Sequence, residues 1–136
     1  MYLLDTNVVS ELRRGRRGDR GVRDWFDSIP TEEMHLSVIT DLELEIGVLG
    51  TERRDREQGM RFRSWLTAIR SEFGPRLLPV HVEDARLAAA LHVPDRRPYA
   101  DALIAATALR RGLTMVTRNE RDFRVQGLRV LNPFRG

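Results

Sequence analysis

The sequence contains neither cysteine nor lysine, and it has no long run of apolar residues. A chain without cysteine can form no disulfide bond, no thiolate metal site and no cysteine nucleophile. No apolar segment approaches the roughly 18 to 20 residues that a membrane span requires. The first residues, Met1–Asp5, also lack the basic region and apolar stretch of a secretory signal, so we expect a cytoplasmic protein without a membrane partner.

The positive charge is carried by arginine alone. The chain has 23 basic residues, all of them arginine, against 20 acidic residues, and its formal net charge is +3. Guanidinium groups make bidentate contacts with phosphate that an ammonium group cannot make. A basic chain with acidic residues concentrated at particular positions suits a protein that attracts an anionic polymer and holds a cation.

Length and patterning predict a single α/β domain over residues 1–136, because the chain has no repeat and no linker that would divide it. Short apolar segments predict strands at residues 1–4, 34–39, 77–82, 113–117 and 128–131. Helical patterns lie between them, at residues 8–14, 22–29, 41–49, 62–73, 83–91 and 100–111. This alternation predicts a central parallel β-sheet with helices on both faces.

Acidic residues follow the predicted strands. Asp5 ends the first strand, and Asp122 follows the fourth. Glu43 comes shortly after the second strand, and Asp101 opens the almost wholly apolar helix at 100–111. Because sites in parallel sheets form beyond the carboxyl ends of the strands, we expect the four carboxylates to share a pocket. Their mutual repulsion there would require a cation, and oxygen-only ligands select Mg²⁺ or Mn²⁺.

Each of these acids also has a purely structural explanation. Asp5 suits a turn, and Asp101 would be favoured in a first helical turn by the helix dipole. Thr40 and Glu43 have the spacing of a capping box, and Asp122 fits an exposed loop. Only the four positions taken together favour the metal pocket.

The segments that carry these acids resemble the motifs of VapC-type PIN-domain toxins, which belong to bacterial toxin–antitoxin pairs. Leu4–Leu12 is similar to the opening of those toxins, and Ser37–Gly47 to their second motif. Ala100–Ala106 and Thr117–Phe123 are similar to the third and fourth. The motifs occur in order over nearly the whole chain, so the resemblance is specific.

The resemblance implies a PIN fold and a Mg²⁺- or Mn²⁺-dependent endoribonuclease that hydrolyses RNA. It implies a VapB-like antitoxin partner, a homodimer and a higher assembly with the antitoxin. It makes Asp5, Glu43 and Asp101 the core catalytic acids, with Asp5 and Asp101 as metal ligands. The fourth acid is assigned to Asp122, although some family members carry an aspartate where this chain has Asn119.

Three further features of the sequence have more than one interpretation or outcome. Thr6 and Thr117 either orient a ligand or water, or only cap local structure. The arginines beside the first motif form either an RNA track or a solvated loop; they include Arg13, Arg14, Arg16 and Arg17. The segment 91–99 is shorter than in the family pattern, which we expect to alter one wall of the substrate groove.

Two rival functions compete with this interpretation. An aspartate-based phosphatase or a receiver domain also places an aspartate after its first strand. Both normally use a lysine near the phosphoryl group, which this chain lacks, and the phosphatase pattern needs an acid where Asn7 stands. The second rival is a catalytically inactive PIN-like scaffold that binds RNA or a partner, but the presence of all four acids argues against it.

Overall fold

A five-stranded sheet forms the centre of the computed structural model, which describes residues 1–136. Its strand order is β3-β2-β1-β4-β5, and each neighbouring pair is parallel. The strands are β1 (Tyr2–Leu4), β2 (Met34–Ser37), β3 (Leu77–Leu78), β4 (Thr114–Val116) and β5 (Val130–Leu131). The chain adds β2 on one side of β1 and β4 on the other, so the strand order reverses at β1. The predicted parallel sheet is confirmed.

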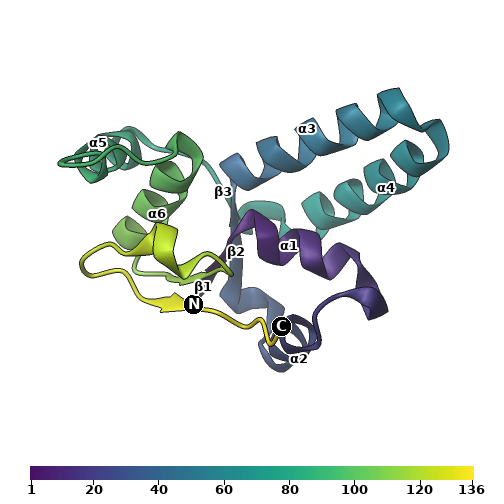
Figure 1. Ribbon diagram of the computed structural model, residues 1–136, viewed down its shortest axis with the longest axis horizontal. Helices are drawn as coiled ribbons and strands as arrows, with labels where there is room; N and C mark the ends of the chain where they lie inside the picture. Colours follow the sequence, from purple (N-terminus) through teal and green to yellow (C-terminus); the bar gives the residue numbers. More distant parts are fainter.

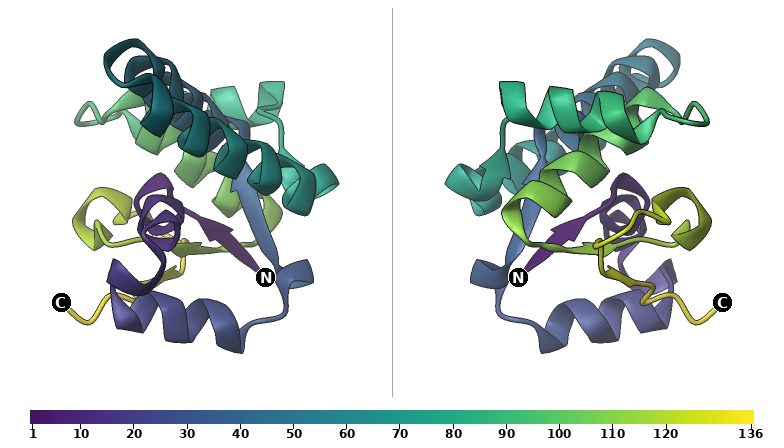
Figure 2. Two further views of the ribbon diagram at one scale, coloured as in Figure 1. Left: turned by 90° about the vertical axis from the view of Figure 1, so that its right-hand side faces the viewer. Right: turned by 90° about the vertical axis from the view of Figure 1, so that its left-hand side faces the viewer.

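Six α-helices cover the two faces of this sheet (Figures 1 and 2). They are α1 (Thr6–Arg13), α2 (Arg20–Ser28), α3 (Val38–Arg54), α4 (Arg56–Phe73), α5 (Val82–Leu91) and α6 (Tyr99–Arg111). Short 3₁₀ turns complete the chain, among them η1 (Gly15–Arg17) and η4 (Glu120–Phe123). No helix is both long enough and apolar enough to cross a membrane.

The strands place alternate side chains on opposite faces, and this divides the core in two. Leu4 and Val116 lie in the cluster formed with α1, α2, α3 and α4. Leu3 and Met115 lie in the cluster formed with α6. All four side chains are completely buried. The sheet is therefore covered on both faces, as predicted, and its carboxyl edge is free to carry polar groups.

Helices α3 and α4 form an antiparallel pair that projects from the sheet (Figure 1). Arg63 of α4 binds Glu45 and Glu52 of α3, at 2.7 and 3.3 Å, and Arg70 of α4 binds Glu45 at 2.7 Å. The hydrogen bonds from the two arginines lower the pKa of Glu45 to about 2. These contacts fix the direction of α3, whose first turns carry Glu43.

Several predicted boundaries are wrong; α4, for example, begins at Arg56 and not at residue 62. Two of the differences have a clear physical cause. Helix α3 begins at Val38, three residues before the predicted start, because the Ser37 hydroxyl caps it by accepting a hydrogen bond from the Ile39 N–H at 3.0 Å. Thr40 consequently lies inside the helix, and the capping-box interpretation of Thr40 and Glu43 is excluded. Strand β3 stops at Leu78 because Pro79 has no N–H to donate to the neighbouring strand.

A buried ion pair joins α5 to α6. The Asp84 side chain is fully buried, and it accepts hydrogen bonds from the Arg110 guanidinium and from the His81 N–H. Burial alone would raise the pKa of Asp84, but these hydrogen bonds outweigh it and lower the pKa below 3.8. The pair helps to fix α6, the helix that carries Asp101.

We expect Asp84→Asn to lower the free energy of unfolding at pH 7 by about 1 to 2 kcal/mol, because Arg110 loses its charged acceptor. Folding lowers the pKa of Asp84, so its ionised form stabilises the fold, and this contribution is present above about pH 4. The variant lacks that contribution. The difference from the parent should shrink as the pH falls below that value, as measured by urea denaturation. Glu83→Gln, which changes an exposed neighbour, is the control and should shift stability by less than about 0.5 kcal/mol.

Candidate active site at the carboxyl edge of the sheet

A polar cavity of about 460 Å³ opens at the carboxyl edge of the sheet. Its lining comes from segments that are far apart in the sequence: Asp5, Thr6, Asn7, Ser10, Glu11, Glu43, Asp101, Arg118, Asn119 and Phe134. Three of the four acids singled out from the sequence thus share one cavity. Glu11 and Arg118 also line it, and sequence reasoning missed both.

Asp5 is held at the centre of this edge, where β1 ends and α1 begins. Its Oδ1 accepts from the Thr6 N–H at 2.8 Å, and its Oδ2 accepts from the Thr117 hydroxyl at 2.7 Å and from the Asn7 amide at 3.2 Å. The residue is only 5% exposed. Burial raises the pKa of Asp5, as do the charges of Glu43 and Asp122, and the hydrogen bonds offset this only in part.

Glu43 reaches the cavity from the second turn of α3. Its Oε1 accepts a hydrogen bond of 2.6 Å from the Thr6 hydroxyl, and that hydroxyl lies 3.0 Å from the hydroxyl of Thr40. Thr6 therefore links α1 to α3. Both Thr6 and Thr117 orient acidic side chains, so they do more than cap local structure.

Asp101 lies in the first turn of α6 and lines the same cavity. Burial raises its pKa to about 6, with further contributions from the charges of Asp5, Asp122 and Glu43. No hydrogen bond offsets that shift, in contrast to Asp5. A half-buried carboxylate without a protein donor is well suited to bind a cation.

Asp122 lies outside the cavity lining. It is exposed in η4 and borders an adjoining depression together with Asn119, which lines both. Asp122 is nevertheless near enough for its charge to raise the pKa values of Asp5 and Asp101. Of the two candidates for the fourth position, Asn119 is in the cavity and Asp122 carries the charge.

Arg97, in the short segment between α5 and α6, joins the Asp122 turn to the end of α5. Its guanidinium donates to the backbone carbonyl of Leu91 at 2.9 Å, and to those of Asp122 and Arg124 at 3.4 and 3.2 Å. Its sequence neighbourhood gives no signal for this role, since the contacts are to backbone atoms of a distant turn. Arg97 therefore ties the turn that carries Asp122 to the segment that leads into α6.

The donor set fits a hydrated hard cation. No three acidic or histidine side chains lie close enough together to hold one ion directly. Mg²⁺ usually keeps several of its waters and binds through one or two carboxylates, so a ready-made cage is not needed. The cavity offers carboxylate, hydroxyl and amide oxygens, and it contains no imidazole or thiolate ligand that would favour zinc.

The fold and the site define an α/β protein with an acidic cavity at the point where the strand order reverses. Residues 2–127 match the family model of the PIN domain, and the chain belongs to this family.

Relatives match over almost the full chain. Plasmid stability protein StbB of Pseudomonas syringae pv. tomato is 35% identical over 98% of this chain and 99% of its own length. VapC ribonuclease Y4jK of Sinorhizobium fredii is 33% identical over 98% of each chain. The crystal structure of FitAcB from Neisseria gonorrhoeae superposes with a TM-score of 0.84, at 33% identity over 98% of each chain. The predicted fold and the predicted resemblance to VapC-type PIN proteins are confirmed.

We expect Asp101→Asn to raise the free energy of unfolding of the metal-free protein at pH 7 by about 1 to 2 kcal/mol. The folded protein has a pKa of about 6 at Asp101, above the usual 3.8, so ionisation of this group destabilises the fold. That penalty is absent below about pH 4, grows as the pH rises and is complete above pH 6. The gain should therefore vanish at acidic pH.

Urea denaturation in EDTA at several pH values measures this effect. Asp95→Asn, an exposed acid in the preceding loop, is the matched control and should change little. A loss of stability in Asp101→Asn at pH 7 would instead show that the carboxylate mainly stabilises the first turn of α6.

Proposed function

We propose that this protein is a Mg²⁺- or Mn²⁺-dependent endoribonuclease, the toxin half of a toxin–antitoxin pair. The observation that carries the proposal is the convergence of Asp5, Glu43 and Asp101 in one cavity, with raised pKa values at Asp5 and Asp101. Membership of the PIN family supports it, as do the relatives named VapC ribonuclease and Toxin FitB. The reaction is hydrolysis of an RNA phosphodiester bond.

Asp5 and Asp101 are the proposed direct ligands of the metal, and Glu43 and Asp122 complete the acidic set through water. A divalent ion bound there would lower the pKa of a water molecule and offset charge on the phosphoryl and leaving oxygens. Thr117 keeps the Asp5 carboxylate in one orientation, which fixes where its free lone pairs point. Thr6 does the same for Glu43.

Arg118 and Asn119 supply the donors that an anionic substrate needs in an otherwise acidic cavity. The backbone N–H of Arg118 donates to the Asn7 side chain at 3.2 Å, and its guanidinium stacks on Phe134 at 5.0 Å. These contacts hold a cation at the rim of the cavity. We propose that Arg118 binds a phosphate oxygen of the RNA beside the bond that is cut.

The partner is proposed to be a VapB-like antitoxin, with a homodimer of this chain inside a larger complex. Structures that resemble this chain are described as FitAB bound to DNA and as DNA-bound VapBC from Salmonella typhimurium. The outer face of α3 exposes an apolar stripe of Leu42, Ile46 and Leu49, each more than half exposed. A stripe of this kind on a monomer is typical of a contact surface.

The phosphatase and receiver alternatives lose their basis, because the chain belongs to the PIN family. The inactive scaffold remains the alternative that an activity assay has to decide.

We expect purified protein to cleave single-stranded RNA with Mg²⁺ or Mn²⁺ and to lose this activity in EDTA. Asp5→Asn should reduce cleavage by about 100-fold or more, because it removes a proposed metal ligand while keeping the shape of the side chain. Asp95→Asn should cleave like the parent. Cleavage that survives both EDTA and Asp5→Asn would contradict the proposal, and no cleavage under any condition would favour the inactive scaffold.

Metal binding can also be detected without a substrate. Saturating Mn²⁺ should raise the melting temperature of the parent, since a ligand at about 100 times its Kd stabilises a fold by about 2.7 kcal/mol. Asp5→Asn and Asp101→Asn should each lose most of this shift, whereas Asp95→Asn should keep it. An equal shift in all four proteins would place the metal elsewhere.

A further inference from the structure

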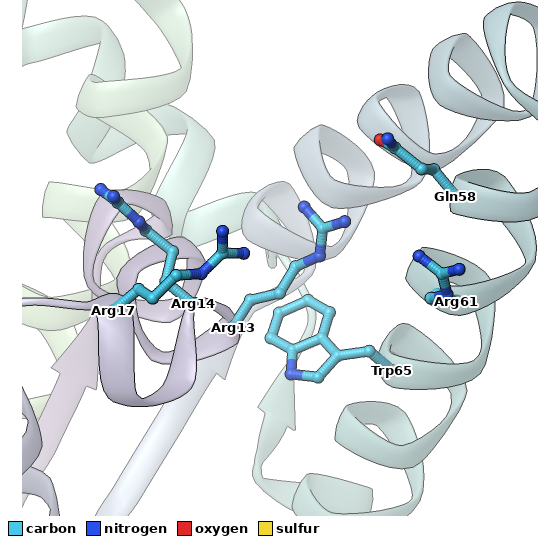
Figure 3. Close-up of a pocket in the computed structure, with 6 residues that line it drawn as sticks. All are labelled: Arg13, Arg14, Arg17, Gln58, Arg61 and Trp65. Atoms are coloured by element: carbon cyan, nitrogen blue, oxygen red, sulfur yellow. The ribbon is translucent and has the colours of Figure 1, made fainter.

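A second groove, of about 400 Å³, lies at the other end of α1, between that helix with η1 and the helix α4 (Figure 3). Arg13, Arg14 and Arg17 line one side of it, and Gln58, Arg61 and Trp65 of α4 line the other; Arg13 reaches toward α4, whereas the guanidinium of Arg14 points away from it. No acidic side chain lines this groove, and Trp65 is its only apolar one. The groove is the electrostatic opposite of the acidic cavity.

Most of the positive charge in the groove is not neutralised. Arg13 and Arg17 form no ion pair, and the contact of Arg14 with Glu11 is long, at 3.8 Å. Only Arg61 has a close carboxylate, Glu57, at 2.6 Å on the exposed surface of α4. Exposed ion pairs of this kind contribute little to stability, so the arginines of the groove remain available to bind an anion favourably.

Arg13 is held in place by an aromatic ring. Its guanidinium stacks on Phe62 of α4 at 3.6 Å, and burial lowers its pKa. The group still remains charged at any physiological pH. Arg13 is thus an exposed cation in the groove lining whose position the Phe62 ring restrains, so it has less freedom to lose on binding than an unsupported surface arginine.

Trp65 presents its indole between Arg13 and Arg61 (Figure 3). The half-buried ring packs against Phe62, with the centroids 6.1 Å apart, and against the core, and its exposed part lines the groove. A flat aromatic surface flanked by guanidinium groups is the arrangement that binds a single nucleic-acid strand, through base stacking and phosphate contacts.

The groove and the acidic cavity are close enough for one RNA strand to occupy both. Helix α1 has 8 residues and spans about 12 Å, with the acidic cavity at its start and the groove at its end. We propose that the groove binds the part of the RNA next to the bond that is cut. Arg13, Arg17 and Arg61 contact its phosphates, and Trp65 stacks on a base. This assignment rests on the proposed ribonuclease function.

The observations favour RNA over an acidic peptide. A peptide docks with apolar anchors and backbone hydrogen bonds, whereas this groove offers four guanidinium groups, one amide and one indole. The sequence pattern that suggested an RNA track covered only the α1 side. Arg61, Gln58 and Trp65 add the opposite wall, and Arg16 does not line the groove.

The test measures the affinity for a fluorescent single-stranded RNA in EDTA, where cleavage does not interfere. Replacing Arg17 and Arg61 together by glutamine should weaken binding and reduce the slope of log affinity against log salt by about 0.7 for each phosphate that the variant no longer binds. Trp65→Leu should weaken binding by about 5-fold or more, and Trp65→Phe should restore much of it, because stacking is retained. Melting curves establish that each variant is folded.

A matched control replaces Arg86 and Arg111 by glutamine, two exposed arginines on α5 and α6. This control removes the same charge, and its RNA affinity should be closer to that of the parent than the affinity of the Arg17 and Arg61 double variant is. Equal losses of affinity in both double variants, or no loss in folded Trp65→Leu, would overturn the proposal. An oligoglutamate peptide that binds the parent as tightly as the RNA does, and fails to bind the groove variants, would also overturn it, in favour of a peptide site.

The cleavage assay separates this inference from the function on which it rests. If the groove variants lose RNA affinity but the parent shows no nuclease activity, the groove remains an RNA site and the ribonuclease proposal fails. If the groove variants bind RNA normally and the parent is an active, metal-dependent nuclease, the ribonuclease proposal stands and the groove proposal fails.

Discussion

The structure depends on one buried carboxylate at the end of its central strand. Asp5 is almost fully enclosed, yet its oxygens must stay available for chemistry. The Thr117 hydroxyl from the end of β4 and the Thr6 N–H from the start of α1 bind it from two sides. These two elements are therefore fixed relative to β1. Helices α3 and α6 then bring Glu43 and Asp101 to the same cavity.

Much of the fold and part of the site could be predicted from the sequence. Strands and helices alternate clearly, and the carboxyl ends of parallel strands meet at one edge, so four acids were expected together. Asp5, Glu43 and Asp101 share the cavity, whereas Asp122 borders the adjoining depression. The start of α3 was misplaced because Ser37 and Thr40 are both capable caps, and only the backbone geometry selects Ser37. Arg97 was missed because it binds backbone carbonyls of a distant turn, and such contacts leave no sequence pattern.

Helix α1 separates two regions of opposite charge. Its first residues line the acidic cavity and the residues at its end line the arginine groove, with the Glu11–Arg14 contact between them. Arg118 is the only cationic side chain that lines the acidic cavity, and no acidic side chain lines the groove. A hydrated cation on one side and a polyanion on the other would each relieve local repulsion, and each would strengthen the binding of the other.

The projecting pair of helices α3 and α4 contributes to both regions. The bonds of Arg63 and Arg70 to Glu45 link the two helices. The base of the pair carries Glu43, and its second helix carries Arg61 and Trp65. A partner bound to this pair of helices would therefore contact a unit that carries part of the acidic cavity and one wall of the groove.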